Sequence, residues 1–216
     1  MSSEDPIEIR PARVTRAQKE QRILDEAEVQ FAQFGFEGAS LESIAAAAGI
    51  SRHNLLYYFS GKEVLYRRVL DDVLEQWLVG MGELSSAEDP EAALSAYIAS
   101  KVRSSMERPS GAKIFAKEII AGAPRYADVI RDRVQPLLQA DVKTFERWAR
   151  KGLIARLNFT HLMFIIWSAT QAYAELGTQF SLLLGKPELE ARDFEQAQTL
   201  ITRLVLAGLR KDAGTA

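Results

Sequence analysis

The chain has 216 residues, carries 27 Lys and Arg against 29 Asp and Glu for a net charge of -2, and is 47% hydrophobic, which suffices for a core of its own. It contains no cysteine, so disulfides, thiolate metal ligands and cysteine nucleophiles are excluded. No apolar run reaches the roughly 18 to 20 residues that a membrane span needs. The first 20 residues are charged rather than signal-like, so we expect a cytoplasmic protein.

Basic residues gather near the start of the chain. Residues 10–70 contain nine Lys or Arg and seven Asp or Glu, and a basic residue falls about every three positions at Arg10, Arg13, Arg16, Lys19 and Arg22. Phosphate binding requires such a local cationic face. An ordinary solvated helix start explains the same pattern equally well, so this feature alone does not predict nucleic-acid binding.

Apolar residues recur at helical spacing after about residue 12, and no run alternates in the manner of a strand, so we expect an all-α protein. The first helix is predicted over about 15–35 and is expected to end in the glycine-bearing stretch 35–38. Its apolar stripe consists of Ile23, Ala27, Phe31 and Phe34. Ser40 is placed to cap a short second helix that ends at Gly49.

The later helices follow from caps, breaks and apolar spacing. Ser51 is placed to cap a third helix over about 52–58, and Ser60 to cap a fourth that runs from near Lys62 to about Gly80. Pro136 predicts a kink or split, because proline removes a backbone donor and clashes with the preceding turn. Further helices are predicted over roughly 91–107, 111–121, 125–151, which contains this proline, 160–184 and 188–210.

The second and third predicted helices, joined by a glycine-bearing turn, form the helix-turn-helix pattern, in which the second helix enters the DNA major groove by its N-terminal end. Ala45 lets the two helices approach, Gly49 permits the turn, and Arg52, His53 and Asn54 project from the leading end. Arg can bind guanine, and Asn adenine, with two hydrogen bonds, each pair being worth roughly 1–3 kcal/mol of discrimination.

Other residues of this region suit phosphate contacts, which position a protein on DNA without reading sequence. They are Tyr57, Tyr58 and Lys62, together with the backbone amides near Ser40 and Lys62. Tyrosines at helical spacing are often core residues, so Tyr58 could equally point inward, and Phe59 is expected in the core.

Residues 15–70 resemble the TetR family of bacterial transcriptional regulators. The likeness is carried by the long first helix, the stretch FAQFGFEGASLESIAAAAGIS, the run LYYF and the pair Lys62-Glu63. It implies a homodimer on a palindromic operator, with a flexible arm over 1–14, a three-helix DNA-binding domain over 15–62 and a helical ligand-binding and dimerisation domain over 63–216. Many members have tyrosine at the position of Leu56, which can meet a thymine methyl group or simply pack. The expected DNA contacts are Ser40, Ser51, Arg52, His53, Asn54, Leu56, Tyr57, Tyr58 and Lys62.

A looser likeness, over most of the chain, is to a member of this family that regulates pyrimidine utilisation. It rests on NLLYYF, the region of Trp77, the AGAP stretch at 121–124 and MFIIWSATQAYA at 163–174. It implies Trp77, Trp167 and Gln171 as ligand-binding residues and uracil or thymine as the effector. Indoles can stack on a flat pyrimidine while the Gln amide pairs with a ring carbonyl and N–H. The alternative is that the tryptophans are ordinary core residues.

The last two predicted helices carry more apolar residues than one buried stripe requires. The surplus suits a four-helix dimer interface made by Phe164, Ile165, Leu176, Phe180, Leu200, Leu204 and Leu206. The alternative is that these residues only close the core of the monomer.

An enzyme has little support in the sequence. The two histidines, His53 and His161, are too few for most His-based metal sites, and no catalytic triad, phosphate-binding glycine loop or nucleotide fingerprint is found, so we expect no metal and no cofactor. We expect a DNA-binding regulator, a repressor released by a small molecule. A larger hydrophobic effector acting on efflux or catabolic genes is the alternative ligand class, and a helical protein-interaction module is the alternative without DNA.

Overall fold

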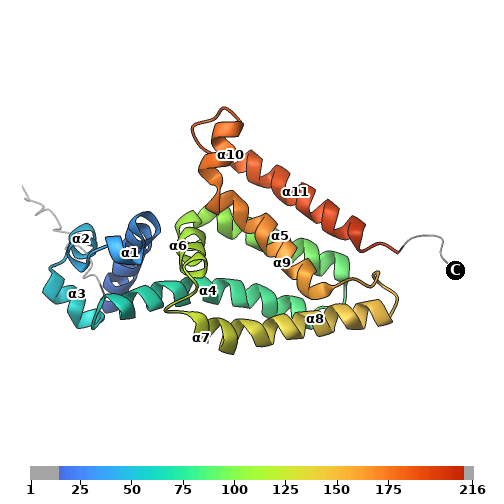
Figure 1. Ribbon diagram of the computed structural model, residues 1–216, viewed down its shortest axis with the longest axis horizontal. Coiled ribbons are helices and arrows are strands. Elements are labelled where there is room, and N and C mark those ends of the chain that lie inside the picture. Colours follow the sequence, from blue (N-terminus) through green and yellow to red (C-terminus); the bar gives the residue numbers. More distant parts are fainter. Residues whose placement is uncertain (1–14, 212–216) are drawn as a thin grey trace, which may run out of the picture.

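The computed structural model describes residues 15–211, so the predicted arm over 1–14 lies outside the described residues. Every regular element in the described range is helical, which confirms the all-α class (Figure 1). None of these helices is long and apolar enough to cross a membrane.

Three helices form a small head at one end of the molecule. They are α1 (Arg16–Gly38), α2 (Leu41–Ala47) and α3 (Arg52–Tyr58). Thr15 starts α1 with a capping box, in which its hydroxyl accepts from the Gln18 amide at 3.2 Å. Gly35, with φ of 72°, kinks α1 and does not end it, so the helix continues three residues beyond the predicted limit of about residue 35.

The long helix α4 (Lys62–Ser86) leaves the head and runs through the body of the molecule (Figure 1). Two expectations about it are wrong. Its N-cap is Gly61, without a side-chain cap bond, and not Ser60. Gly80 does not end the helix, which continues to Ser86. Gly80 instead lies against the ring of Tyr97 in α5, where an added Cβ would be 3.4 Å from the ring carbons. The glycine therefore allows two helices to approach.

The body consists of α5 (Pro90–Glu107), α6 (Pro109–Ile120), α7 (Ala127–Val129), the π-helical segment η1 (Ile130–Val134), α8 (Gln135–Arg150), α9 (Phe159–Glu175), α10 (Gly177–Leu183) and α11 (Ala191–Gly208). The predicted stretch 125–151 is split at η1, directly before the first turn of α8, which contains Pro136. The predicted stretch 160–184 is divided between Glu175 and Gly177.

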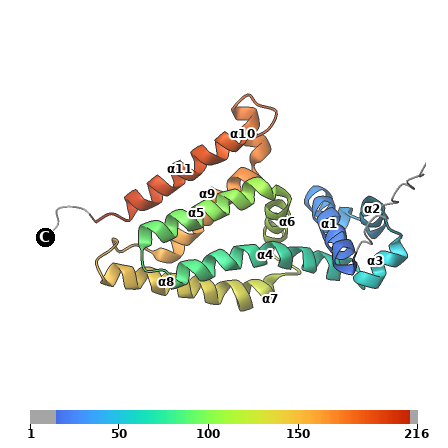
Figure 2. The ribbon, with the colours of Figure 1, turned by 180° about the vertical axis from the view of Figure 1, so that it is seen from behind.

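Two clusters of buried side chains hold these parts together. One joins α1–α3 to the first half of α4 and includes Phe31, Leu55 and Leu65. The other joins the second half of α4 to the body helices and includes Phe145 and Trp148. Helix α6 lies between the head and the body and packs against both α1 and α9 (Figures 1 and 2). Helices α4 and α6 therefore connect the two ends of the molecule.

Candidate functional site

The turn between α2 and α3 is fixed by local contacts. The hydroxyls of Ser40 and Ser51 accept from the amides of Ser43 and Asn54 at 3.0 and 3.2 Å, so both serines cap their helices as predicted. Gly49 has φ of 69°, a left-handed conformation that favours glycine. Leu55 is fully buried beneath the turn. The two short helices are thus held in a defined arrangement.

The leading end of α3 faces solvent. Arg52, His53 and Asn54 are all exposed, as the sequence predicts. The Arg52 guanidinium is held by Glu42 of α2, whose carboxylate lies 2.6 Å from Nε. The end of α3 therefore offers hydrogen-bonding groups to a partner outside the chain.

The remaining expected DNA contacts are in three settings. Tyr57 is 70% exposed, and the Arg16 guanidinium lies 5.3 Å from the centre of its ring. Leu56 and Tyr58 are half-buried and pack against the core of the head. Lys62 donates from Nζ to the Glu37 carbonyl at 3.2 Å, so its ammonium is already engaged. Their contact with DNA stays a prediction, whereas the burial expected of Phe59 is confirmed.

The basic residues of α1 contribute to the same surface. Lys19 and Arg22 line a groove against the turn together with Ser51 and Asn54. Sequence periodicity identified the basic repeat but could not decide whether it faced the helix-turn-helix. The structure brings two of its cations beside α3, which adds a cationic border of the kind that phosphate binding requires.

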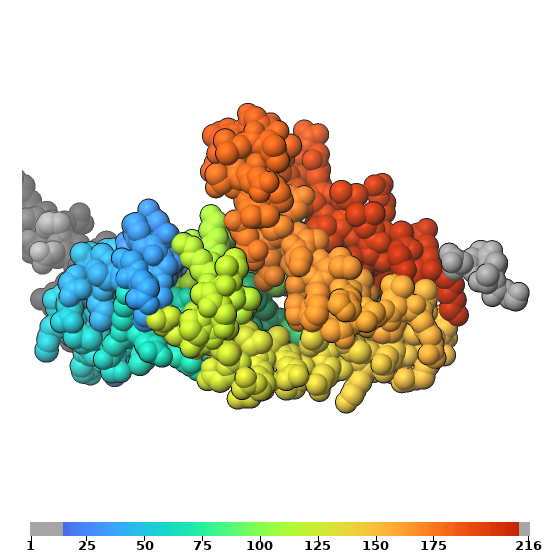
Figure 3. All heavy atoms as spheres, in the orientation of Figure 1, coloured from blue at the N-terminus to red at the C-terminus, as the bar shows by residue number. Residues whose placement is uncertain are grey.

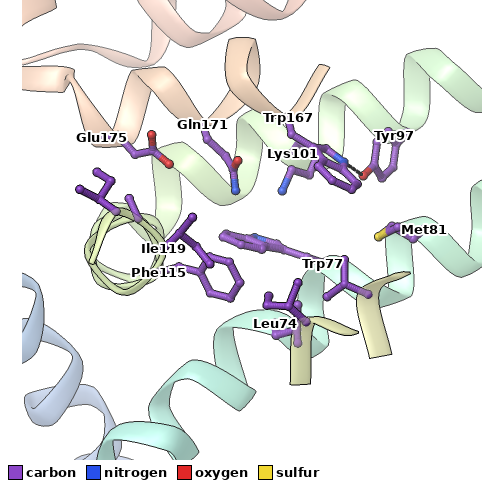
Figure 4. A pocket seen from close by; sticks show the side chains of 14 residues that line it. Leu74, Trp77, Met81, Tyr97, Lys101, Phe115, Ile119, Trp167, Gln171 and Glu175 are labelled. Atoms are coloured by element: carbon purple, nitrogen blue, oxygen red, sulfur yellow. Dashed lines mark hydrogen bonds between the residues drawn. The ribbon is translucent and has the colours of Figure 1, made fainter. Parts of the chain in front are cut away.

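A cavity of about 350 Å³ lies in the body, where α4, α5, α6 and α9 meet η1. Figure 3 shows a hollow between α6, α9 and the segment leading into α8. Trp77, Trp167 and Gln171 all line this cavity, although Trp77 of α4 is far in the sequence from the other two, which lie on α9 (Figure 4). The structure thus brings together the three residues predicted to bind a ligand.

Both indole N–H groups in the pocket are bonded to protein. Trp77 donates to the Ser104 hydroxyl at 3.2 Å, and Trp167 donates to the Tyr97 hydroxyl at 2.7 Å. The ring of Trp77 also meets the ring of Phe115 edge-on, with centroids 4.8 Å apart. The two indoles are therefore fixed in orientation and offer a ligand their ring surfaces and not their N–H groups.

Two charged residues of the pocket were missed by sequence reasoning. Lys101 of α5 is 4% exposed, and Glu175 of α9 stands one helical turn beyond Gln171. Burial lowers the pKa of Lys101 to about 7, against the opposing charge of Glu175. Burial raises the pKa of Glu175, against the opposing charge of Lys101. A lysine on the apolar stripe of α5, four residues after Tyr97, was the available signal.

The pocket has one apolar and one polar side. Leu74 and Ile119 come from α4 and α6, whereas Lys101, Gln171 and Glu175 come from α5 and α9 (Figure 4). Such a cavity suits a flat molecule with a polar edge. Within residues 15–211 no group of three or more His, Asp or Glu side chains could hold a metal ion.

Fold and turn geometry together define an all-helical protein with a helix-turn-helix in its head and a cavity in its body. Residues 23–69 match the family model "Bacterial regulatory proteins, tetR family", and residues 70–212 match "YcdC-like protein, C-terminal region". The chain belongs to the TetR family and is a transcriptional regulator, not an enzyme.

Similar proteins agree with this assignment. The chain is 35% identical over 192 residues to the HTH-type transcriptional regulator RutR of Escherichia coli strain K12, covering 89% of this chain and 91% of RutR. Among solved structures, the TetR family regulator PfmR of Thermus thermophilus has a TM-score of 0.69 at 21% identity, covering 88% of this chain and all of that one (100%). A TetR-like regulator of Rhodococcus sp. RHA1 has a TM-score of 0.68 at 19% identity, covering 91% and 98%. At these identities the solved structures show the fold alone.

Proposed function

We propose that this protein is a cytoplasmic repressor whose homodimer binds a palindromic operator through α3 and is released when uracil or thymine fills the body pocket. The observation that carries the effector assignment is the meeting of Trp77, Trp167 and Gln171 in one cavity. The likeness of the sequence to a regulator of pyrimidine utilisation supports it further. The protein needs no cofactor in this proposal, because the effector is a ligand and not a reactant.

Operator binding is supported by the surface of the head. The exposed end of α3 carries donors that can read base edges, and Lys19 and Arg22 lie beside it. In dimeric helix-turn-helix proteins the two reading helices lie about one DNA turn apart, roughly 34–36 Å, or a multiple of it. A change in that separation would weaken binding.

A route for the effector signal is supported by α4 and α6. Helix α4 starts in the head and carries Trp77 to the pocket. Helix α6 carries Phe115 to the pocket, and on its other side Lys117 donates from Nζ to the Gln33 carbonyl of α1 at 3.0 Å. Coupling of about 1–3 kcal/mol through such contacts would weaken operator binding roughly 5- to 150-fold.

Dimerisation is supported by the apolar surface of α9–α11. Ile165 and Leu204 are 61% and 62% exposed. The other residues expected at the interface are exposed or half-buried: Phe164, Leu176, Phe180, Leu200 and Leu206. A monomer in water rarely leaves so many large apolar side chains uncovered.

A larger hydrophobic effector is the second candidate. It is favoured by the apolar side of the pocket, where Ile119 and Ile120 are 44% and 85% exposed. A cavity of about 350 Å³ would hold such a molecule as well as a pyrimidine.

Thermal-shift measurements with pyrimidines and with apolar compounds separate the two effector classes. We expect uracil or thymine to raise the melting temperature, and Gln171→Ala to abolish the rise. No shift with either pyrimidine at millimolar concentration, or a shift that Gln171→Ala leaves unchanged, would reject the pyrimidine assignment. A gel shift with the promoter region beside the protein's own gene tests operator binding independently of the effector.

A further inference from the structure

Lys101 carries its ammonium group into the pocket without a carboxylate partner. The residue is 4% exposed, and Nζ lies 3.9 Å from the centre of the Trp77 ring. Within residues 15–211 no carboxylate oxygen lies within 4.0 Å of Nζ. The indole face stabilises a cation, but it replaces only part of the hydration that the ammonium loses on burial.

None of the other charged groups near Lys101 forms an ion pair with its ammonium in the described part of the chain. Glu175 of α9 is the acid whose charge favours the protonated form, but it stands beyond the 4.0 Å of an ion pair. On α5, the Tyr97 hydroxyl accepts a hydrogen bond from Trp167, while Arg103 and Glu107 line a second, smaller cavity that Lys101 and Trp77 also border. The residues of α6 and η1 that line the pocket are all apolar.

Resting on the proposed function, we propose that the Lys101 ammonium donates a hydrogen bond to a carbonyl oxygen of the effector, and that the pocket takes up a proton from solvent when the effector binds. Figure 4 shows Lys101 and Gln171 entering the pocket from the same side, above Trp77. A carbonyl oxygen at Lys101 supplies the missing acceptor and so favours the charged form of the lysine.

The pair of Lys101 and Gln171 also defines the chemical class of ligand. A cyclic imide such as uracil presents a carbonyl oxygen to Lys101 and, beside it, an N–H to the Gln171 amide oxygen. Cytosine carries an amino donor in place of the C4 carbonyl, so it can meet the two residues only through its C2 carbonyl and N1–H. The pair therefore favours a ring that presents a carbonyl oxygen beside an N–H, and uracil offers that arrangement on more edges than cytosine does.

Proton uptake follows from the charge state of the empty pocket. Because burial lowers the pKa of Lys101 to about 7, a fraction of the lysines is neutral in slightly alkaline solution. Effector binding protonates the lysines that are neutral in the empty pocket. Uracil should consequently bind roughly five- to tenfold more tightly at about pH 6 than at about pH 8, and its binding should take up roughly half a proton or more per site near pH 7.5.

Calorimetric titration of uracil into the full-length dimer, in two buffers of different ionisation enthalpy, measures this uptake directly. In Lys101→Met we expect the uptake to vanish and the affinity for uracil to fall roughly 10- to 100-fold. Lys143→Met, which removes an exposed lysine of α8, is the matched control and should behave as wild type. Thermal unfolding of each variant reports whether it is folded.

Glu175→Gln tests whether Lys101 is the group that takes up the proton, because a purely structural role of Lys101 would leave the pH range of proton uptake unchanged in this variant. Removing this acid withdraws the charge that supports the ammonium, so the pH range of proton uptake should move to lower pH. Uracil binding without any proton uptake at about pH 7 to 8.5, with an unchanged affinity in Lys101→Met, would overturn this inference and leave the proposed function intact. Failure of wild type to bind uracil or thymine at all would instead overturn the pyrimidine assignment, and this inference with it.

Discussion

Asp141 of α8 is fully buried, and neither of its carboxylate oxygens has a hydrogen-bond partner in the described part of the chain. Burial raises its pKa to about 8, compared with about 3.9 for an unperturbed aspartate. Between these two values the folded protein holds a proton that the unfolded chain releases. The free energy of unfolding should therefore fall as the pH rises from about 4 to about 8.

Asp141→Asn tests this effect, because asparagine keeps the shape of the protonated acid and cannot ionise. We expect the variant to match wild type near pH 4 and to be more stable by several kcal/mol near pH 8. Urea unfolding at a series of pH values measures the difference. A stability gap that does not change with pH would show that Asp141 is not the group responsible.

Arg52 lies at the exposed N-terminal end of α3, where we expect it to contact a base of the operator. Arg52→Ala should weaken operator binding by about 1–3 kcal/mol and relax the preference at one base position. Lys19→Ala, in the neighbouring groove, should weaken binding to all sequences alike and lower the salt dependence by about one counterion. Anisotropy titrations on the operator and on its single-base variants distinguish a lost base preference from a uniform loss of affinity. Identical base preferences in wild type and Arg52→Ala would refute base reading by Arg52.

Residue roles that depend on near neighbours could be predicted, and roles that depend on distant ones could not. Ser40 and Ser51 cap their helices because the amide that each one binds is three residues away. Lys101 stands on the apolar stripe of α5, but its burial could not be predicted, because it is created by α4 and α9, which meet α5 only in the folded chain. Trp77, Trp167 and Gln171 were predicted through the family resemblance, not through spacing.

At the scale of elements, Arg108 ties three helices together between the head and the body. Standing at the junction of α5 and α6, it donates from Nε to the Glu28 carboxylate of α1 at 2.8 Å and from Nη2 to the Asp72 carboxylate of α4 at 2.7 Å. Glu28 is 5% exposed, and burial raises its pKa against the opposing effect of Arg108. These ion pairs join the head to α4, the helix that carries Trp77 into the pocket.

Arg108→Met should lower the free energy of unfolding by about 2–4 kcal/mol, because it leaves the buried Glu28 without a partner. The double variant Arg108→Met with Glu28→Gln should lose less than the sum of the single changes, since no unpaired buried charge remains. Arg192→Met, on the exposed side of α11, is the control. Denaturant unfolding provides the values, and strict additivity would contradict the ion-pair account.

Element boundaries show the same division between local and distant causes. The split near Pro136 could be predicted, because proline acts on its own helix. The continuation of α4 past Gly80 could not, because that glycine serves a contact with Tyr97 of another helix. A glycine at a helix end and a glycine at a helix crossing look alike in the sequence.

At the scale of the whole molecule, dimerisation should depend on the exposed apolar surface of α9–α11. Leu204→Asp places a charge where a partner subunit would remove it from water, so we expect a folded monomer with greatly weakened operator binding. Sedimentation velocity reports the oligomeric state, and circular dichroism reports the helical fold. Glu195→Gln, an exposed change at the start of the same helix, should remain dimeric. A Leu204→Asp protein that stays dimeric would move the interface elsewhere.

The central claim is that a molecule in the body pocket controls DNA binding by the head. Anisotropy titration of the protein on duplex DNA from the promoter beside its own gene, with and without millimolar uracil, tests this claim most directly. We predict tight binding without uracil and a loss of at least about fivefold with it, abolished in Gln171→Ala. Operator binding that saturating uracil leaves unchanged, or no binding to this DNA even at low salt, would contradict the account.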